Sequence, residues 1–187
     1  MEALAGVAGR TDVERRDLER LRALVSAASG WDDLWSRSTP LHVTGSGFVV
    51  HPPTGRVLLR WHDRQQAWIQ VGGHGDPGEG HPLDVARREA IEETGLHDVR
   101  PWPEVGEPQL LHAVIVSVPA NDHEPAHEHA DLRYVLATDA PDDASPEHDG
   151  ADLRWLGVAE AIELTTAENV KESLRRVGEL LSPPTIG

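Results

Sequence analysis

A glycine-rich segment that runs directly into an acidic helix constrains this chain more than any other feature. Residues 72–96 read GGHGDPGEGHPLDVARREAIEETGL. Pro82 suits the first turn of a helix, and Gly95 suits the position just past its end. The glycines before Pro82 favour a loop whose backbone can approach a metal ion or a phosphate closely. The sequence therefore predicts a ligand-binding loop followed by a helix.

Three carboxylates crowd onto one face of this predicted helix. Glu89, Glu92 and Glu93 lie at positions i, i+3 and i+4, a spacing at which like charges destabilise a helix by about 0.2–0.5 kcal/mol per pair. A bound cation would reverse that sign, and carboxylate oxygens suit Mg²⁺ or Mn²⁺. Such charge runs are usually only a solvated face. Here the glycine-rich approach and the fixed Arg-Glu-x-x-Glu-Glu-x-Gly order favour a metal site, with Arg88 placed to orient Glu92.

These residues resemble the Nudix box, G-x5-E-x7-R-E-U-x-E-E-x-G-U, in which U is aliphatic. Gly73, Glu79 and the nine residues 88–96 (REAIEETGL) carry the resemblance, and the closing nine match at every specified position. The spacing departs once, because eight residues separate Glu79 from Arg88 where the pattern has seven. We expect the extra residue to lie in the loop, since glycine and proline before residue 83 disfavour a helix there.

The resemblance implies a Nudix-type pyrophosphohydrolase that uses Mg²⁺ or Mn²⁺ to cleave a nucleoside diphosphate linked to another group. By match to the family motif, Glu89 and Glu93 are candidate metal ligands, and Glu92 is a candidate ligand or proton acceptor for the attacking water. Arg88 would orient these carboxylates. Gly73 would offer its backbone carbonyl to the metal.

The candidates for substrate binding are Arg60, Trp68, Gly72, His74 and His129. Trp68 can stack on a nucleobase, although a buried strand tryptophan is the commoner arrangement. Arg60 can contact a phosphate, although a surface arginine is at least as common. The resemblance also implies that a loop carboxylate or histidine assists proton transfer, for which Glu124, Glu128 and His129 are equal candidates.

Histidines are frequent after the motif, at His112, His123, His127 and His129. Such histidine-rich tracts sometimes bind metal. The spacing is not that of a fixed ligand set, so a polar loop near the mouth of the site is the favoured interpretation.

Hydrophobic periodicity places further elements around the motif. Thr11 and Glu14 form a capping-box pattern for a helix over residues 11–28, and Thr165 with Glu168 suggests the start of a closing helix. Residues 31–40 read as a connection, 121–130 as a polar loop and 139–149 as a surface loop. The predicted strands cover residues 41–51, 56–61, 67–71, 109–119, 131–138 and 152–156.

The fold class that follows is α/β. This order of elements fits a sheet layered between helices, and the resemblance implies the Nudix α/β/α sandwich of a mixed sheet between helices. An extra N-terminal helix precedes that sandwich. We divide the chain into a helical extension, residues 1–40, and a Nudix domain, residues 41–187. The extension either covers an edge of the sheet or pairs with a second subunit, which makes a homodimer an open expectation.

Composition narrows the partners. The 187 residues carry a formal net charge of −15 without a Lys/Arg cluster, which argues against binding to nucleic acid. The chain has no cysteine, so disulfides, thiol nucleophiles and zinc-thiolate sites are excluded. No apolar run has the length of a membrane span, and the N-terminus lacks the apolar core of a signal peptide. The expected location is the cytoplasm, and the expected partner is a small nucleoside diphosphate derivative.

Two alternatives belong to other functional classes. A Nudix-fold protein that binds or senses a nucleotide without cleaving it shares the fold, since fold alone does not fix function. The intact set of three glutamates and the lack of an added DNA-binding domain argue against it. The related isopentenyl-diphosphate isomerases depend on a cysteine, which this chain lacks. Among hydrolase substrates, nucleoside triphosphates, ADP-ribose, sugar nucleotides and dinucleoside polyphosphates remain open.

Overall fold

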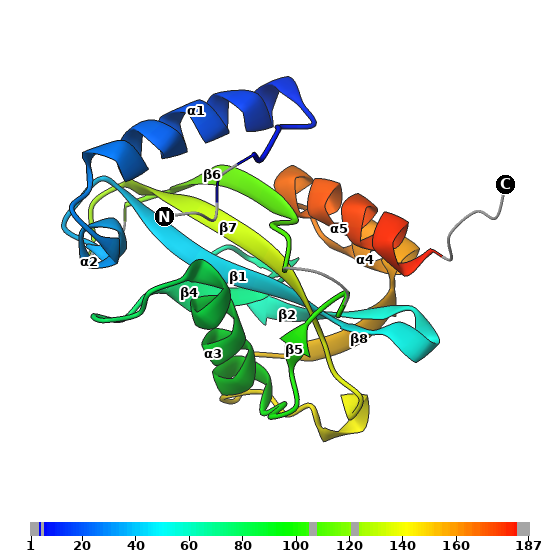
Figure 1. Cartoon of the computed structure of the whole chain (residues 1–187). Helices are drawn as coiled ribbons and strands as arrows, with labels where there is room; N and C mark the ends of the chain where they lie inside the picture. Colours follow the sequence, from blue (N-terminus) through cyan, green and yellow to red (C-terminus); the bar gives the residue numbers. More distant parts are fainter. Residues whose placement is uncertain (1–3, 5, 105–107, 121–123, 183–187) are drawn as a thin grey trace, which may run out of the picture.

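The computed structural model describes residue 4 and residues 6–104, 108–120 and 124–182, and within them a mixed eight-stranded sheet lies between helices (Figure 1). The strands are β1 (Leu41–His51), β2 (Arg56–His62), β3 (Ala67–Ile69), β4 (Val71–His74), β5 (Arg100–Pro101), β6 (His112–Val118), β7 (His127–Ala137) and β8 (Leu153–Gly157). The helices are α1 (Asp12–Ala27), α2 (Trp31–Trp35), α3 (Pro82–Thr94), α4 (Val158–Leu164) and α5 (Glu168–Leu181). Short 3-10 turns cover Pro52–Thr54 and Pro141–Asp143.

The long strands β1 and β7 form the parallel centre of the sheet, and the other pairings are antiparallel. On its other edge, β1 pairs with β4 over residues 44–47 and with β2 at its C-terminal end. This pairing of β4 brings the start of the glycine-rich loop to the middle of the sheet. Helices α1, α2 and α3 share core clusters with one face of the sheet, and α4 and α5 pack on the other. The predicted α/β/α sandwich with an additional N-terminal helix is confirmed.

Helix α3 lies close against β1 and β4, as Figure 1 shows. A Cβ at Gly45 of β1 would overlap the carbonyl oxygen of Pro82, so only glycine allows this approach. Pro82 opens the helix, and Gly95 ends it in the left-handed region with φ 68°, its N–H donating to the carbonyl of Ile91. The helix predicted from the proline and glycine positions is therefore confirmed, and its acidic face is fixed relative to the sheet.

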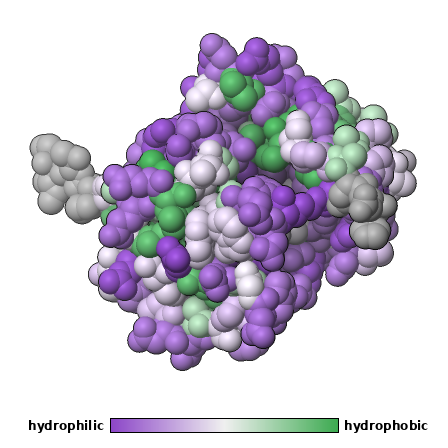
Figure 2. Space-filling view, turned by 180° about the vertical axis from the view of Figure 1, so that it is seen from behind, coloured by the Kyte–Doolittle hydropathy of each residue, from purple (hydrophilic) through white to green (hydrophobic). Residues whose placement is uncertain are grey.

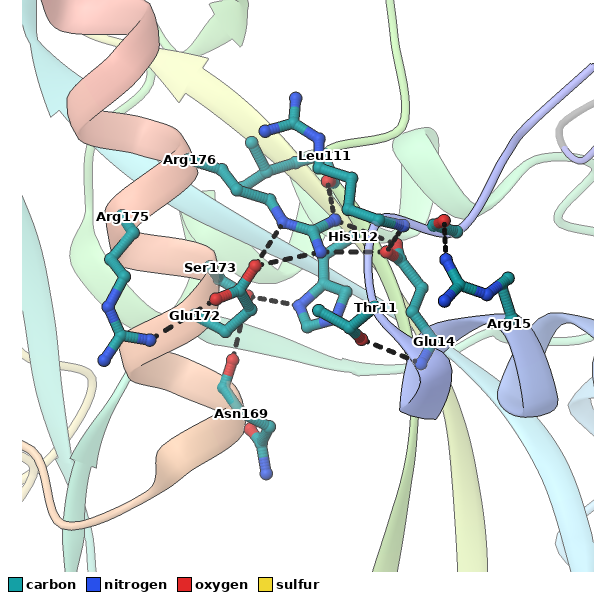
Figure 3. A network of polar contacts seen from close by, with 12 residues as sticks. Thr11, Glu14, Arg15, Leu111, His112, Asn169, Glu172, Ser173, Arg175 and Arg176 are labelled. Atoms are coloured by element: carbon teal, nitrogen blue, oxygen red, sulfur yellow. Dashed lines mark hydrogen bonds and ion pairs between the residues drawn. The ribbon is translucent and has the colours of Figure 1, made fainter.

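The N-terminal helix is anchored to α5 by a buried ion pair (Figure 3). Arg176 donates from Nη1 and Nη2 to the two carboxylate oxygens of Glu14, each at 2.8 Å, and both side chains are 2% exposed. The Oγ1 of Thr11 accepts from the backbone N–H of Glu14, which is one half of the predicted capping box. The Glu14 carboxylate pairs instead with Arg176, so α1 is joined to the helix at the far end of the chain.

Three local expectations are wrong. Residues 127–130 do not belong to a polar loop, because they extend β7 alongside β1; residues 121–123 lie outside the described part of the chain. Residues 31–35 form the short helix α2, in which Trp31 stacks on Trp35. Thr165 is not the N-cap of α5, which is Ala167. Thr165 ends α4 instead, a short helix absent from the prediction.

Hydrophilic side chains cover most of the face seen in Figure 2, and apolar residues form small separate groups between them. Among the described residues, the exposed large hydrophobic side chains are Val13 and Leu180. Within the same residues, no helix has the combination of length and apolar character needed to cross a membrane.

Candidate active site

A ladder of polar side chains crosses the central strands on the face opposite α3. On β1 these residues are His42, Thr44 and Ser46, and their register partners on β7 are His129, Asp131 and Arg133. Further along the same two strands, Phe48 and Val135 continue this face as apolar core under α4 and α5. The polar half of the face therefore borders a cavity, while the apolar half is covered by helices.

The cavity has a volume of about 190 Å³ and is shared by the ladder, the glycine-rich loop and α5. Gly72, Gly73 and Glu93 of the Nudix-like motif line it together with Arg60 and Asn169. Residues far apart in the sequence thus meet at one site.

Asp131 organises the base of this cavity. Its carboxylate accepts hydrogen bonds from Thr44 Oγ1 at 3.0 Å, Ser46 Oγ at 2.6 Å, Gln70 Nε2 at 3.2 Å and Arg133 Nε at 2.8 Å. Because all five residues are buried, these bonds fix the side chains in place. The Oε1 of Gln70 is buried without a hydrogen-bond partner among the described residues.

Arg88 is the hub of the acidic face of α3. Its guanidinium donates to both carboxylate oxygens of Glu79, at 3.0 and 3.1 Å, and to Glu89 and Glu92, each at 2.9 Å. It also donates to the backbone carbonyl of His74 at 2.8 Å. The hydrogen bonds from Arg88 lower the pKa of the Glu79 carboxyl. Glu79 thus supports Arg88 despite the extra residue between them, as expected for an insertion placed in a loop.

Among the carboxylates on the acidic face of α3, Glu93 is the most buried. Its pKa is also shifted the furthest from its ordinary value. Its Oε1 pairs with Arg60 Nη1 at 2.8 Å, and its Oε2 accepts the backbone N–H of Gly72 at 3.0 Å. Burial nevertheless raises the pKa of Glu93 to about 7, with Arg60 opposing the shift. Burial also raises the pKa of Glu89. Burial therefore disfavours the charged form of both carboxylates, even though each has an arginine partner.

A divalent cation fits this donor set. Burial raises the cost of ionising Glu89 and Glu93, and a hard cation bound between the two carboxylates would offset it. A Cβ at Gly73 would overlap the carboxylate of Glu89, so the bare backbone of this strand lies directly against that group. Glu92 is half exposed at the rim, with 53% of its side chain accessible.

Histidines gather beside the cavity. Ring nitrogens of His42, His74 and His129 all lie within 4.8 Å of one another, and His127 adjoins His129. Burial lowers the pKa of His74 to about 3 and that of His129 to about 4. Of the other two histidines considered from the sequence, His112 lies elsewhere, bonded to Ser173, and His123 is outside the described residues.

The remaining candidates divide between the cavity and the surrounding structure. Arg60, Gly72, His74 and His129 line the cavity. Trp68 does not; it is buried in the core against Trp61, and the guanidinium of Arg154 lies 4.4 Å from the centroid of its ring.

The three candidates for assisting proton transfer lie in different surroundings. Glu124 and Glu128 pair with Arg64 and Arg20, and Glu128 is not among the residues that line the cavity. Of the three, only His129 borders it.

Of the ladder, sequence reasoning identified only His129 and missed His42, Thr44, Ser46, Asp131 and Arg133. It also missed Gln70, which bonds to Asp131. A signal was present. In both central strands, polar residues alternate with apolar or small ones, in HVTGS (residues 42–46) and HADLR (residues 129–133). Polar residues at a period of two on an otherwise buried strand place a polar stripe on one face.

The fold and the site define a class of protein, an α/β/α sandwich whose acidic helix and glycine-rich loop border a cavity. The family model of the NUDIX domain matches residues 41–177. The chain therefore belongs to the Nudix family, and the expectation of a Nudix-type hydrolase is confirmed at that level. Among curated proteins, none matches the chain.

Solved structures share the fold. A C. elegans Ap4A hydrolase is 19% identical with a TM-score of 0.57, over 74% of this chain and 96% of that one. The E. coli dihydroneopterin triphosphate pyrophosphohydrolase is 17% identical with a TM-score of 0.53, over 74% and 94%. A NUDIX-family hydrolase from Clostridium perfringens is 26% identical with a TM-score of 0.53, over 75% and 98%.

Proposed function

We propose that this protein is a Mg²⁺- or Mn²⁺-dependent pyrophosphohydrolase that cleaves the diphosphate linkage of a nucleoside diphosphate joined to another group. The observation that carries the proposal is the acidic face of α3, where Arg88 donates to Glu89 and Glu92 while Glu93 lines a polar cavity. Burial raises the pKa values of Glu89 and Glu93.

Each residue of the motif has a separate role in the proposed reaction. Glu89 and Glu93 hold the divalent cation, with the Gly73 carbonyl as a further ligand. When bound, the cation neutralises diphosphate oxygens and lowers the pKa of a coordinated water. Glu92, which is exposed at the rim, completes the ligand set or accepts the proton from that water. Arg88 keeps the carboxylates in position.

The substrate binds across the cavity. Arg60 lines the cavity and pairs with Glu93, and its Nε is buried without a partner among the described residues. A guanidinium in that position suits a phosphate oxygen. The polar ladder and the free Gln70 acceptor suit the nucleoside portion. The two named neighbours act on Ap4A and on dihydroneopterin triphosphate, which supports a nucleotide-like phosphate ester as substrate.

A non-catalytic nucleotide-binding role is the second candidate function. It shares the fold, and no single observation favours it. The complete set of glutamates and the hydrogen bonds from Arg88 that order Glu89 and Glu92 support hydrolysis instead.

A substrate panel tests the proposal. Nucleoside triphosphates, ADP-ribose, sugar nucleotides and dinucleoside polyphosphates are each incubated with Mg²⁺ or Mn²⁺, and release of phosphate or nucleotide is measured. We expect cleavage of at least one substrate by the wild type and a loss of more than about 100-fold in Glu93→Gln. Tight binding of one of these compounds without any cleavage would instead support the binding role.

A further inference from the structure

Four imidazole rings come together at the N-terminal end of the β1–β7 pair. The Nε2 of His74 lies 3.1 Å from Nε2 of His42 and 3.2 Å from Nε2 of His129. The Nε2 of His129 lies 3.1 Å from Nε2 of His127. Three strands supply these rings, since His42 is on β1, His74 on β4, and the other two on β7. The Nε2 atoms therefore form a chain of short contacts in the order His42, His74, His129, His127.

His42 and His127 are the outer rings of this chain, and backbone carbonyls fix their tautomers. His42 Nδ1 lies 3.1 Å from the carbonyl oxygen of Thr39, and His127 Nδ1 lies 2.9 Å from that of Pro125. A carbonyl only accepts hydrogen bonds, so each Nδ1 carries the proton and donates it. The neutral outer rings consequently present lone pairs at Nε2. This arrangement, a ring N–H held by a backbone carbonyl, is the usual support of a metal-ligating histidine.

The two inner rings, His74 and His129, do not have enough protons to make a hydrogen bond at every contact between the rings. Three Nε2···Nε2 contacts join the four rings, but only His74 and His129 have an Nε2 proton to give in the neutral state. At least one close contact then lacks a hydrogen. One added positive charge resolves this conflict, as either a proton on an outer ring or a metal ion. Burial opposes the proton, and His42 is only 1% exposed.

We propose that His42, His74 and His129 form a binding site for a transition-metal ion of the zinc type, and His127 lies beside His129. Imidazole nitrogens select such ions over Mg²⁺. Tetrahedral zinc with bonds of 2.0–2.1 Å holds its ligand nitrogens about 3.3 Å apart, close to the separations of His74 from His42 and from His129, 3.1 and 3.2 Å. All three ligand nitrogens lie within 4.8 Å of one another, so a bound ion would draw His42 and His129 together.

The histidine site is accessible, and its ligand set differs from that of the carboxylate site. A second cavity of about 200 Å³ reaches His42, His74 and His127 from the side of residues 37–40, which provides an entry path. The carbonyl of His74 accepts a hydrogen bond from Arg88. A metal at the histidines would therefore hold the end of β4 next to the Nudix motif, through a ligand set that contains none of its glutamates.

Titration of the full-length protein with Zn²⁺ in the presence of saturating Mg²⁺ tests the proposal by calorimetry. Mg²⁺ occupies the carboxylate oxygens, so the imidazole site is measured by itself. We expect one Zn²⁺ per chain, with affinity lowered about 100-fold or more in His42→Ala and in His129→Asn. His97→Ala, which removes an exposed histidine, and Glu93→Gln should both bind as the wild type does.

A measurement on the wild type alone keeps the test independent of whether the variants fold. Co²⁺ bound by imidazoles in a four-coordinate site absorbs visible light strongly, whereas Co²⁺ on six oxygens absorbs weakly. We expect the strong spectrum at one equivalent of Co²⁺ under saturating Mg²⁺. Absence of Zn²⁺ uptake, a weak spectrum, or an equal loss of affinity in Glu93→Gln would overturn the proposal and leave the assignment of the Mg²⁺ site unaffected.

Discussion

Glu79 accepts two hydrogen bonds from the guanidinium of Arg88, from Nε at 3.0 Å and from Nη2 at 3.1 Å. The sequence has one residue more between them than the Nudix pattern. The loop absorbs it, because Asp76 and Glu79 close a turn in which backbone and side chain of Glu79 both bond to Asp76. Glu79 therefore reaches the metal site only through Arg88.

The first prediction follows from that indirect role. Glu79→Ala should lower kcat/KM by about 10–100-fold, the usual range for residues that hold a metal ligand in place. Glu93→Gln should lower it further, because it removes charge at the cation itself. Both variants are compared with the wild type at saturating Mg²⁺. A defect in Glu79→Ala as deep as that in Glu93→Gln would mean that Glu79 binds the metal directly.

The second prediction concerns stability and pH. Burial raises the pKa of Glu93 to about 7 in the folded protein, above the ordinary value of 4.5. Between these values the Glu93 carboxyl binds more protons in the folded state than in the unfolded state, so its contribution to the free energy of unfolding falls as pH rises through this window. The buried histidines, whose pKa values are lowered, act in the opposite direction. The contribution of Glu93 is therefore measured as a difference between the wild type and a variant, by urea unfolding in EDTA at about pH 5 and about pH 8.

Two variants isolate this contribution. Relative to the wild type, Glu93→Gln should gain stability from about pH 5 to about pH 8, since it fixes the side chain in an uncharged form. Glu92→Gln, at a half-exposed position, should retain the slope of the wild type. Equal slopes in the wild type and Glu93→Gln would show that burial does not perturb this carboxyl.

The motif was predictable from the sequence because its determinants are local. Pro82 and Gly95 mark the ends of α3, and helical spacing alone places Glu89 and Glu93 together. The polar ladder was not predicted, since it depends on which residues of β1 face which residues of β7. Thr44 and Asp131 are 87 positions apart, and only the strand register brings them into contact. The same parallel pairing turned an expected polar loop into the start of β7.

The third prediction concerns Arg60. Arg60→Gln should raise KM about tenfold or more, with a smaller change in kcat, because a hydrogen bond to a charged group contributes about 1.5–3 kcal/mol. Steady-state kinetics at saturating Mg²⁺ measure both constants. Arg56→Gln, which changes an exposed arginine on the same strand, serves as the control. An unchanged KM in Arg60→Gln would remove Arg60 from the phosphate site.

The fourth prediction tests the anchoring of the N-terminal helix. Glu14→Ala leaves the charge of Arg176 buried and without its bidentate partner, a change that typically costs about 3–5 kcal/mol. Glu19→Ala, on the exposed side of the same helix, should change stability by less than about 0.5 kcal/mol. Urea unfolding measures both. Equal stability of the two variants would show that the ion pair drawn in Figure 3 does not hold α1 in place.

The central claim is that the carboxylates of α3 hold a divalent cation on which diphosphate cleavage depends. The most direct measurement is the rate of cleavage of the best substrate in EDTA, followed by addition of Mg²⁺ or Mn²⁺ in excess. Without the cation, no group in the site lowers the pKa of the attacking water. We expect no turnover above background in EDTA and recovery on adding metal. Full turnover in EDTA would contradict the proposed function.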